Sequence, residues 1–112
     1  MTNKLAKTLL FLTSLGYFGS VFGGDATLVG NPEAGEQRYK KTCINCHGAA
    51  GKGVASYPKV SGKDISYTIS KLETYRDGIK IGPNSSLMIM MAKPLSDEEI
   101  VNLAAYLKDA VP

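Results

Sequence analysis

One five-residue segment, Cys43-Ile44-Asn45-Cys46-His47, constrains this chain more than any other, because it places two thiols three residues apart and an imidazole directly after them. This is the spacing by which c-type haem is attached. The two thiolates are placed to add across the two vinyl groups of a haem, and His47 then lies under the iron as its proximal nitrogen ligand. We therefore predict one covalently bound haem c, attached through Cys43 and Cys46, with His47 as an axial iron ligand.

Three other interpretations of this segment receive little support from the rest of the chain. A tetrahedral zinc site needs four ligands, and the 112 residues contain only two Cys and one His. A dithiol oxidoreductase motif normally lies in a βαβ unit, and the sequence has no such alternation of strand and helix patterns. A disulfide between such close residues closes almost no loop and would stabilise the fold little.

The length and charge of the chain limit the remaining classes of protein. A chain of 112 residues is one small domain, for which a buried haem would add a large apolar surface to the core. The formal charge of +3 includes Lys4 and Lys7 of the leader described below, so the rest of the chain carries +1. The longest basic cluster is Lys40-Lys41, and the sequence therefore does not indicate nucleic-acid binding.

The first residues have the pattern of a secretory signal peptide. Residues 1–7 carry two lysines and no acid, and residues 8–22 are mostly apolar or small. This apolar part is about 15 residues long, below the roughly 20 needed to span a bilayer. We predict a cleaved signal peptide over 1–24 and a single exported, periplasmic domain over 25–112. The alternative is an uncleaved leader that anchors the protein in the membrane.

Three stretches begin with helix-start signals: Asn31-Pro32-Glu33, Asp64, and the capping box from Ser96 to Glu99. From these signals and the apolar periodicity that follows them, we predict helices over 31–46, 64–77 and 96–110. Gly78 is placed to end the second of these helices. No strand pattern competes with them, so the sequence predicts an all-α domain.

A methionine-rich segment lies between the second and third predicted helices. Residues 82–86 break the helical pattern, and Leu87 to Met91 contains three methionines, so we expect a loop here. These apolar residues could simply belong to the core. In a haem protein, however, a thioether is a soft ligand for the sixth iron position, and a Met/His pair raises the reduction potential.

Taken together, these motifs resemble those of class I c-type cytochromes of the small bacterial single-haem type, over roughly residues 31–111. The resemblance is carried by Gly35, Tyr39, the Cys43–His47 segment, Tyr57-Pro58, the methionine cluster and residues 95–107. It implies an all-α, small single-domain class I cytochrome c fold, with about three to five helices wrapped around one covalently bound haem. It also implies that the first and last helices cross near a right angle, at Gly35, Tyr39, Leu103 and Tyr106.

The resemblance further indicates which methionine binds the iron. In similar proteins this methionine lies seven residues before the leucine of a Leu-Ser-Asp helix start, and counting back from Leu95 gives Met88. Many relatives have Met-Pro at the ligand, and this chain does not, so Met90 and Met91 remain alternatives.

Residues around the haem can also be suggested. The resemblance implies that the Pro58 carbonyl accepts the other ring N–H of His47. Arg76 and Tyr57 are candidate partners of the haem propionates.

The function implied by the resemblance is electron transfer rather than enzymatic catalysis. With His47 and Met88 on the iron, no position is open to a substrate. We expect a carrier that moves electrons between respiratory donor and acceptor proteins by transient docking at the haem edge. The alternative is a cytochrome subunit of a larger dehydrogenase, such as a flavoprotein sulfide dehydrogenase. A haem enzyme or gas-binding protein would require that no methionine binds the iron.

Overall fold

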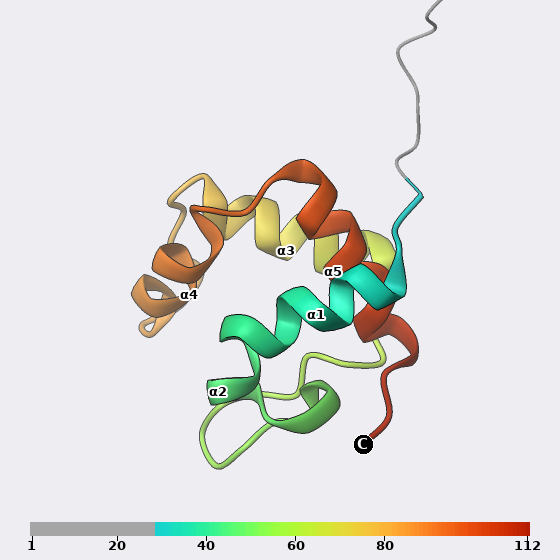
Figure 1. Cartoon of the computed structure of the whole chain (residues 1–112). Helices are drawn as coiled ribbons and strands as arrows, with labels where there is room; N and C mark the ends of the chain where they lie inside the picture. The colour runs from blue at the N-terminus through green and yellow to red at the C-terminus, as the bar shows by residue number, and fades with distance from the viewer. Residues whose placement is uncertain (1–28) are drawn as a thin grey trace, which may run out of the picture.

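The computed structural model describes residues 29–112, where five α-helices and one short 3-10 helix follow one another (Figure 1). They are α1 (Pro32–Thr42), α2 (Ile44–His47), η1 (Ala49–Gly51), α3 (Ile65–Arg76), α4 (Ser85–Ala92) and α5 (Asp97–Asp109). The extended backbone pairing in this part of the chain is one isolated bridge between Val54 and Tyr57. The all-α prediction is therefore confirmed.

The predicted signal peptide over 1–24 lies outside the described residues. Within residues 29–112, none of the helices has both the length and the apolar character needed to cross a membrane.

The start of α1 is tied directly to α5. The Asn31 side chain accepts hydrogen bonds from the N–H groups of Glu33 and Ala34, at 3.0 and 3.1 Å, which caps the helix as predicted. The Asn31 N–H in turn donates to Oδ1 of the buried Asn102, at 2.7 Å. Asn31 therefore caps the start of α1, and Asn102 holds that start against α5.

Helices α1 and α5 cross in close contact at Gly35. A Cβ added at Gly35 would overlap the backbone carbonyl of Asn102 and lie 2.9 Å from Cβ of Tyr106, so this approach requires a glycine. One turn further on, the rings of Tyr39 and Tyr106 pack with centroids 5.6 Å apart and a tilt of 54°. The residues that the resemblance assigns to the helix crossing are thus in contact, and this packing offsets the cost of a glycine inside a helix, about 1 kcal/mol.

The apolar core is centred on this crossing. Its buried members are Tyr39, Ala92, Leu95, Ile100, Leu103 and Leu107. They come from α1, α4, α5 and the turn before α5, while α3 packs partly buried residues such as Ile69 and Leu72 against them. The core therefore links the helix before the Cys43–His47 segment to the helix that carries the methionines.

Two of the predicted helix boundaries, the end of α3 and the start of α5, are present, and the end of the first predicted helix differs. Gly78 ends α3 with φ of +79°, and Ser96 and Glu99 form a reciprocal capping box at the start of α5. The helix predicted over 31–46 is instead divided between α1 and α2 at Cys43. The N–H of Cys46 bonds to the Cys43 carbonyl, three residues back at 3.2 Å, whereas an α-helix would use the carbonyl of Thr42, four residues back.

The expectation of a loop around the methionines is wrong, because residues 85–92 form α4. Leu, Met and Ala are strong helix formers, but an isolated helix of 8 residues is marginal in water. Packing against α3 and the burial of Ala92 supply the missing stability. The Ser85 hydroxyl also accepts hydrogen bonds from the N–H groups of Ile81 and Gly82, at 2.9 and 2.8 Å. A segment this uniformly apolar has no periodicity from which to predict a helix.

Candidate haem site

A cavity of about 820 Å³ is lined by residues from all five α-helices and from the loop between η1 and α3. The residues predicted to attach the haem, to bind its iron and to orient His47 all line it: Cys43, Cys46, His47, Met88 and Pro58. These residues are spread over 46 positions of the chain, from 43 to 88. The fold therefore brings the two thiols, the imidazole and a thioether to one cavity.

The His47 ring is held in one orientation by a backbone carbonyl. Its Nδ1 lies 2.8 Å from the oxygen of Pro58, and the side chain is buried. A carbonyl can only accept, so Nδ1 carries the proton and Nε2 keeps a lone pair. The contact expected for Pro58 is thus present, and it leaves the other nitrogen free to bind a metal.

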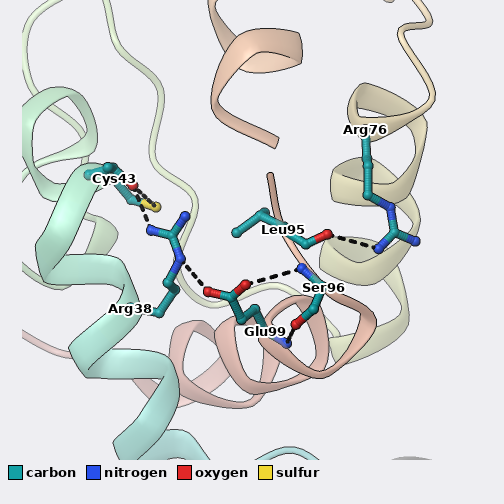
Figure 2. Close-up of polar contacts among 7 residues, drawn as sticks. Arg38, Cys43, Arg76, Leu95, Ser96 and Glu99 are labelled. Atoms are coloured by element: carbon teal, nitrogen blue, oxygen red, sulfur yellow. Dashed lines mark hydrogen bonds and ion pairs between the residues drawn. The ribbon is translucent and has the colours of Figure 1, made fainter. Parts of the chain in front are cut away.

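Cys43 and Cys46 are free, half-buried thiols on the cavity wall. Burial raises the pKa of the Cys43 thiol, while the Thr42 hydroxyl and the positive charge of Arg38 oppose this rise. Figure 2 shows Arg38 reaching from α1 toward both Cys43 and Glu99. Thr42 and Arg38 are therefore polar groups that act on the Cys43 thiol.

The methionines of α4 differ in where they lie. Met88 is half-buried and lines the cavity, and so does Met91, three residues further along the helix. Met90 is 58 % exposed and is not part of the cavity wall. Because residues i and i+3 share one face of a helix, α4 presents two thioethers to the cavity. This narrows the three candidate sulfur ligands to Met88 and Met91.

Tyr39 secures the turn that follows His47. Its hydroxyl donates to the carbonyl of Gly48 at 2.7 Å, and burial of the ring raises the pKa of Tyr39 to about 12. Gly48 has φ of +77°, and a Cβ at this position would lie 2.6 Å from Cγ2 of Val54. The chain therefore turns sharply after His47, and α1 holds that turn in place.

The charged residues on the cavity wall are all lysines. Lys59, Lys63 and Lys71 line it, and no carboxylate does so among the described residues. The ammonium groups of Lys63 and Lys71 lie 5.7 and 5.5 Å from the centroid of the Tyr67 ring. Haem carries two carboxylates, so this positive lining complements its charge.

Of the two suggested propionate partners, only one borders the cavity. Tyr57 lines it, with its ring edge-on to His47 at 6.4 Å. Arg76 does not line it and instead contacts the Leu95 carbonyl at 3.2 Å and Asp97 at 2.7 Å. The suggestion of Arg76 is therefore wrong, because Arg76 connects α3 to the start of α5.

Comparison with known proteins supports the same cofactor. Residues 32–110 match the cytochrome c family. The chain is a cytochrome c. This cytochrome c is 45 % identical over 78 residues to cytochrome c-554(548) of Halomonas halodenitrificans, an alignment that covers 69 % of this chain and 93 % of that protein. It is 38 % identical over 73 residues to a thiosulfate dehydrogenase electron acceptor of Thiomonas intermedia, covering 63 % of this chain and 32 % of that protein.

The fold agrees with that of solved relatives. The structure of reduced cytochrome c4 from Pseudomonas stutzeri superposes with a TM-score of 0.61 and 25 % sequence identity. The superposition covers 73 % of this chain and 50 % of cytochrome c4. This cytochrome c therefore has the class I fold, and it spans half of the cytochrome c4 chain and nearly all of cytochrome c-554(548).

A cytochrome c transfers electrons by means of a covalently bound haem c, and the cavity fits that group. Two adjacent thiols, an imidazole with a free Nε2, and thioethers on α4 are the donor set that the cofactor needs. The apolar side chains and lysines on the wall suit its apolar ring and its two carboxylates.

Proposed function

We propose that this cytochrome c is an exported single-haem electron carrier with His/Met ligation. Cys43 and Cys46 form the two thioether bonds, and His47 and Met88 are the axial ligands. One observation carries the proposal: the cavity gathers these four side chains from the junction of α1 and α2, from α2 and from α4 around one space. The bound haem supplies a one-electron couple.

The protein's own groups favour electron transfer over chemistry on a substrate. The hydrogen bond from Nδ1 of His47 to the Pro58 carbonyl fixes the orientation of the ring, so Nε2 would be held in place to bind the iron in both oxidation states. Met88 would supply the second iron ligand from α4, a helix whose ends are anchored by the buried residues Ser85 and Ala92. With both axial positions supplied by protein, a small molecule reaches the iron only after a ligand bond breaks.

Of the two pocket-facing methionines, we assign Met88 as the ligand. Met88 is the more buried of the two, whereas Met91 is 42 % exposed. Met88 also lies seven residues before Leu95 in the sequence, which is the separation that the resemblance to class I cytochromes implies. Pro58 would orient His47 through its carbonyl and would not itself bind the iron.

We also place this carrier in the periplasm, with its signal peptide cleaved at the start of the 25–112 domain. The lysine-containing, then apolar, N-terminal sequence supports export, and covalent haem attachment follows export in bacterial proteins of this type. The donor and acceptor would dock transiently at the haem edge.

A second role is favoured by one finding among the relatives. One similar protein is named for accepting electrons from thiosulfate dehydrogenase. This cytochrome c could therefore serve as the built-in or dedicated electron acceptor of a dehydrogenase, such as one with a flavoprotein subunit. The haem ligation would be the same in both roles.

Size-exclusion chromatography of a native extract, read at the haem absorbance, separates these roles. A free carrier elutes near the mass of the single chain, since transient redox encounters bury little surface. Elution of all the haem of this protein with a much larger partner would contradict the free-carrier proposal and establish the subunit role. N-terminal sequencing of the purified protein tests the cleaved leader in the same experiment.

A further inference from the structure

A chain of polar contacts runs from the start of α5 to the sulfur of Cys43 (Figure 2). The Arg38 Nε donates to Oε2 of Glu99 at 2.6 Å, and another nitrogen of its guanidinium donates to Oγ1 of Thr42 at 2.9 Å. Oγ1 of Thr42 lies 3.8 Å from Sγ of Cys43, within hydrogen-bonding distance for sulfur. A single hydroxyl group therefore connects the guanidinium to the wall of the cavity.

The direction of these hydrogen bonds follows from the chemistry of the groups. Arginine has donors only, so Oγ1 of Thr42 accepts from Arg38. A thioether sulfur has no hydrogen, so Sγ of Cys43 can only accept once it is bonded to haem. The hydroxyl hydrogen of Thr42 is then the donor to sulfur, and the bond from Arg38 polarises that hydroxyl further.

The positive charge is well placed to act on Cys43. The Arg38 side chain is only 15 % exposed, so water screens its charge less than it would on the surface. Glu99 binds Nε, whereas Thr42 binds a terminal nitrogen of the same guanidinium. Thr42 and Arg38 oppose the rise in the pKa of Cys43 that burial causes. The same two residues form the contact chain to its sulfur.

We propose that Arg38 is a positioning residue that raises the reduction potential of the haem by acting through Thr42 on the sulfur of Cys43. A hydrogen bond to the sulfur, reinforced by a nearby cation, withdraws electron density from the cofactor and favours the ferrous state. This inference rests on the proposed function, because it requires that Cys43 is bonded to the haem. It adds the role of Arg38 and Thr42, which family membership does not assign.

The structure contains a matched control for this role. Arg76 also pairs with a carboxylate at the start of α5, with 2.7 Å between its guanidinium and Asp97, and its side chain is 25 % exposed. Figure 2 shows Arg76 of α3 bonded to the carbonyl of Leu95, in the turn before α5, and Arg38 of α1 bonded to Glu99 of α5. The contacts of Arg76 in the described residues are to Asp97 and Leu95, and none leads to Cys43.

The test is the midpoint potential of the haem-loaded protein, measured by spectroelectrochemical titration. We expect a lower potential in Arg38→Met and a smaller shift in the same direction in Thr42→Val, which loses only the hydroxyl. Thr42→Ser keeps the hydroxyl and should stay near the wild-type potential, and Arg76→Met should not shift it. A wild-type potential in either Arg38→Met or Thr42→Val, or an equal shift in Arg76→Met, would overturn the proposal.

Two further measurements keep the result unambiguous. Thr42→Val breaks no ion pair and preserves side-chain shape, so it decides the question even if Arg38→Met fails to fold. Haem retention after denaturation and the low-spin spectrum are recorded on the same samples. Loss of covalent haem from the wild type would refute the proposed function, whereas normal haem with unchanged potentials would refute only the role of Arg38.

Discussion

Replacing both cysteines, as Cys43→Ser/Cys46→Ser, should reduce the fraction of protein chains that carry covalently bound haem from all to none. The two thiols are free and line one cavity, and each supplies the sulfur of one thioether bond. Denaturation removes every non-covalent contact, so haem then stays with the chain only through these bonds. The measurement is haem absorbance or peroxidase staining of the denatured chain, together with the mass of the mature protein.

The control for this experiment is Met88→Ala, which leaves both cysteines intact and should keep its haem through denaturation. Acid-organic extraction that removes the haem from the wild type would contradict covalent attachment. So would a double cysteine variant that still carries the haem mass.

Met88→Ala should abolish the near-infrared sulfur-to-iron band of the ferric protein and lower its reduction potential. The thioether favours the ferrous state, so replacing it with water or no ligand stabilises the ferric state. Loss of the ligand should also convert part of the ferric protein to a high-spin form. Near-infrared absorbance and a redox titration measure both effects.

Met90→Ala is the matched control, because Met90 comes from the same helix but is largely exposed and lies outside the cavity wall. The near-infrared band and the reduction potential of Met90→Ala should remain those of the wild type. If Met91→Ala loses the band while Met88→Ala keeps it, the assignment moves to Met91, which also lines the cavity.

The sequence was most informative where the structure depends on local signals. The caps at Asn31 and Ser96 mark the true starts of α1 and α5, since a side chain and the backbone a few residues away determine a cap. The haem-attachment segment is equally local, and the cavity contains all of its three functional side chains. The resemblance supplied Met88 and Pro58, which lie far from that segment in sequence.

What sequence could not provide depends on packing between distant segments. α4 is a helix because of tertiary contacts, and its uniform apolar composition has no period to indicate one. Asn102 is a polar residue on the buried side of α5, where its Oδ1 accepts a hydrogen bond from the N–H of Asn31, 71 residues earlier in the sequence. Arg38 and Glu99 are 61 residues apart, and neither residue by itself indicates the pair. In physical terms, the sequence predicts short-range hydrogen bonds well and long-range partners poorly.

Carbon monoxide binding to the ferrous protein tests the central claim most directly, because that claim is that side chains of this chain hold both axial positions. Stopped-flow mixing at neutral pH should show little or no binding, and the ferric protein should be six-coordinate and low-spin under the same conditions. Rapid carbon monoxide binding, or a high-spin ferric spectrum of the wild type, would show an open iron position and contradict the assignment of this cytochrome c as an electron carrier with His47 and Met88 as ligands.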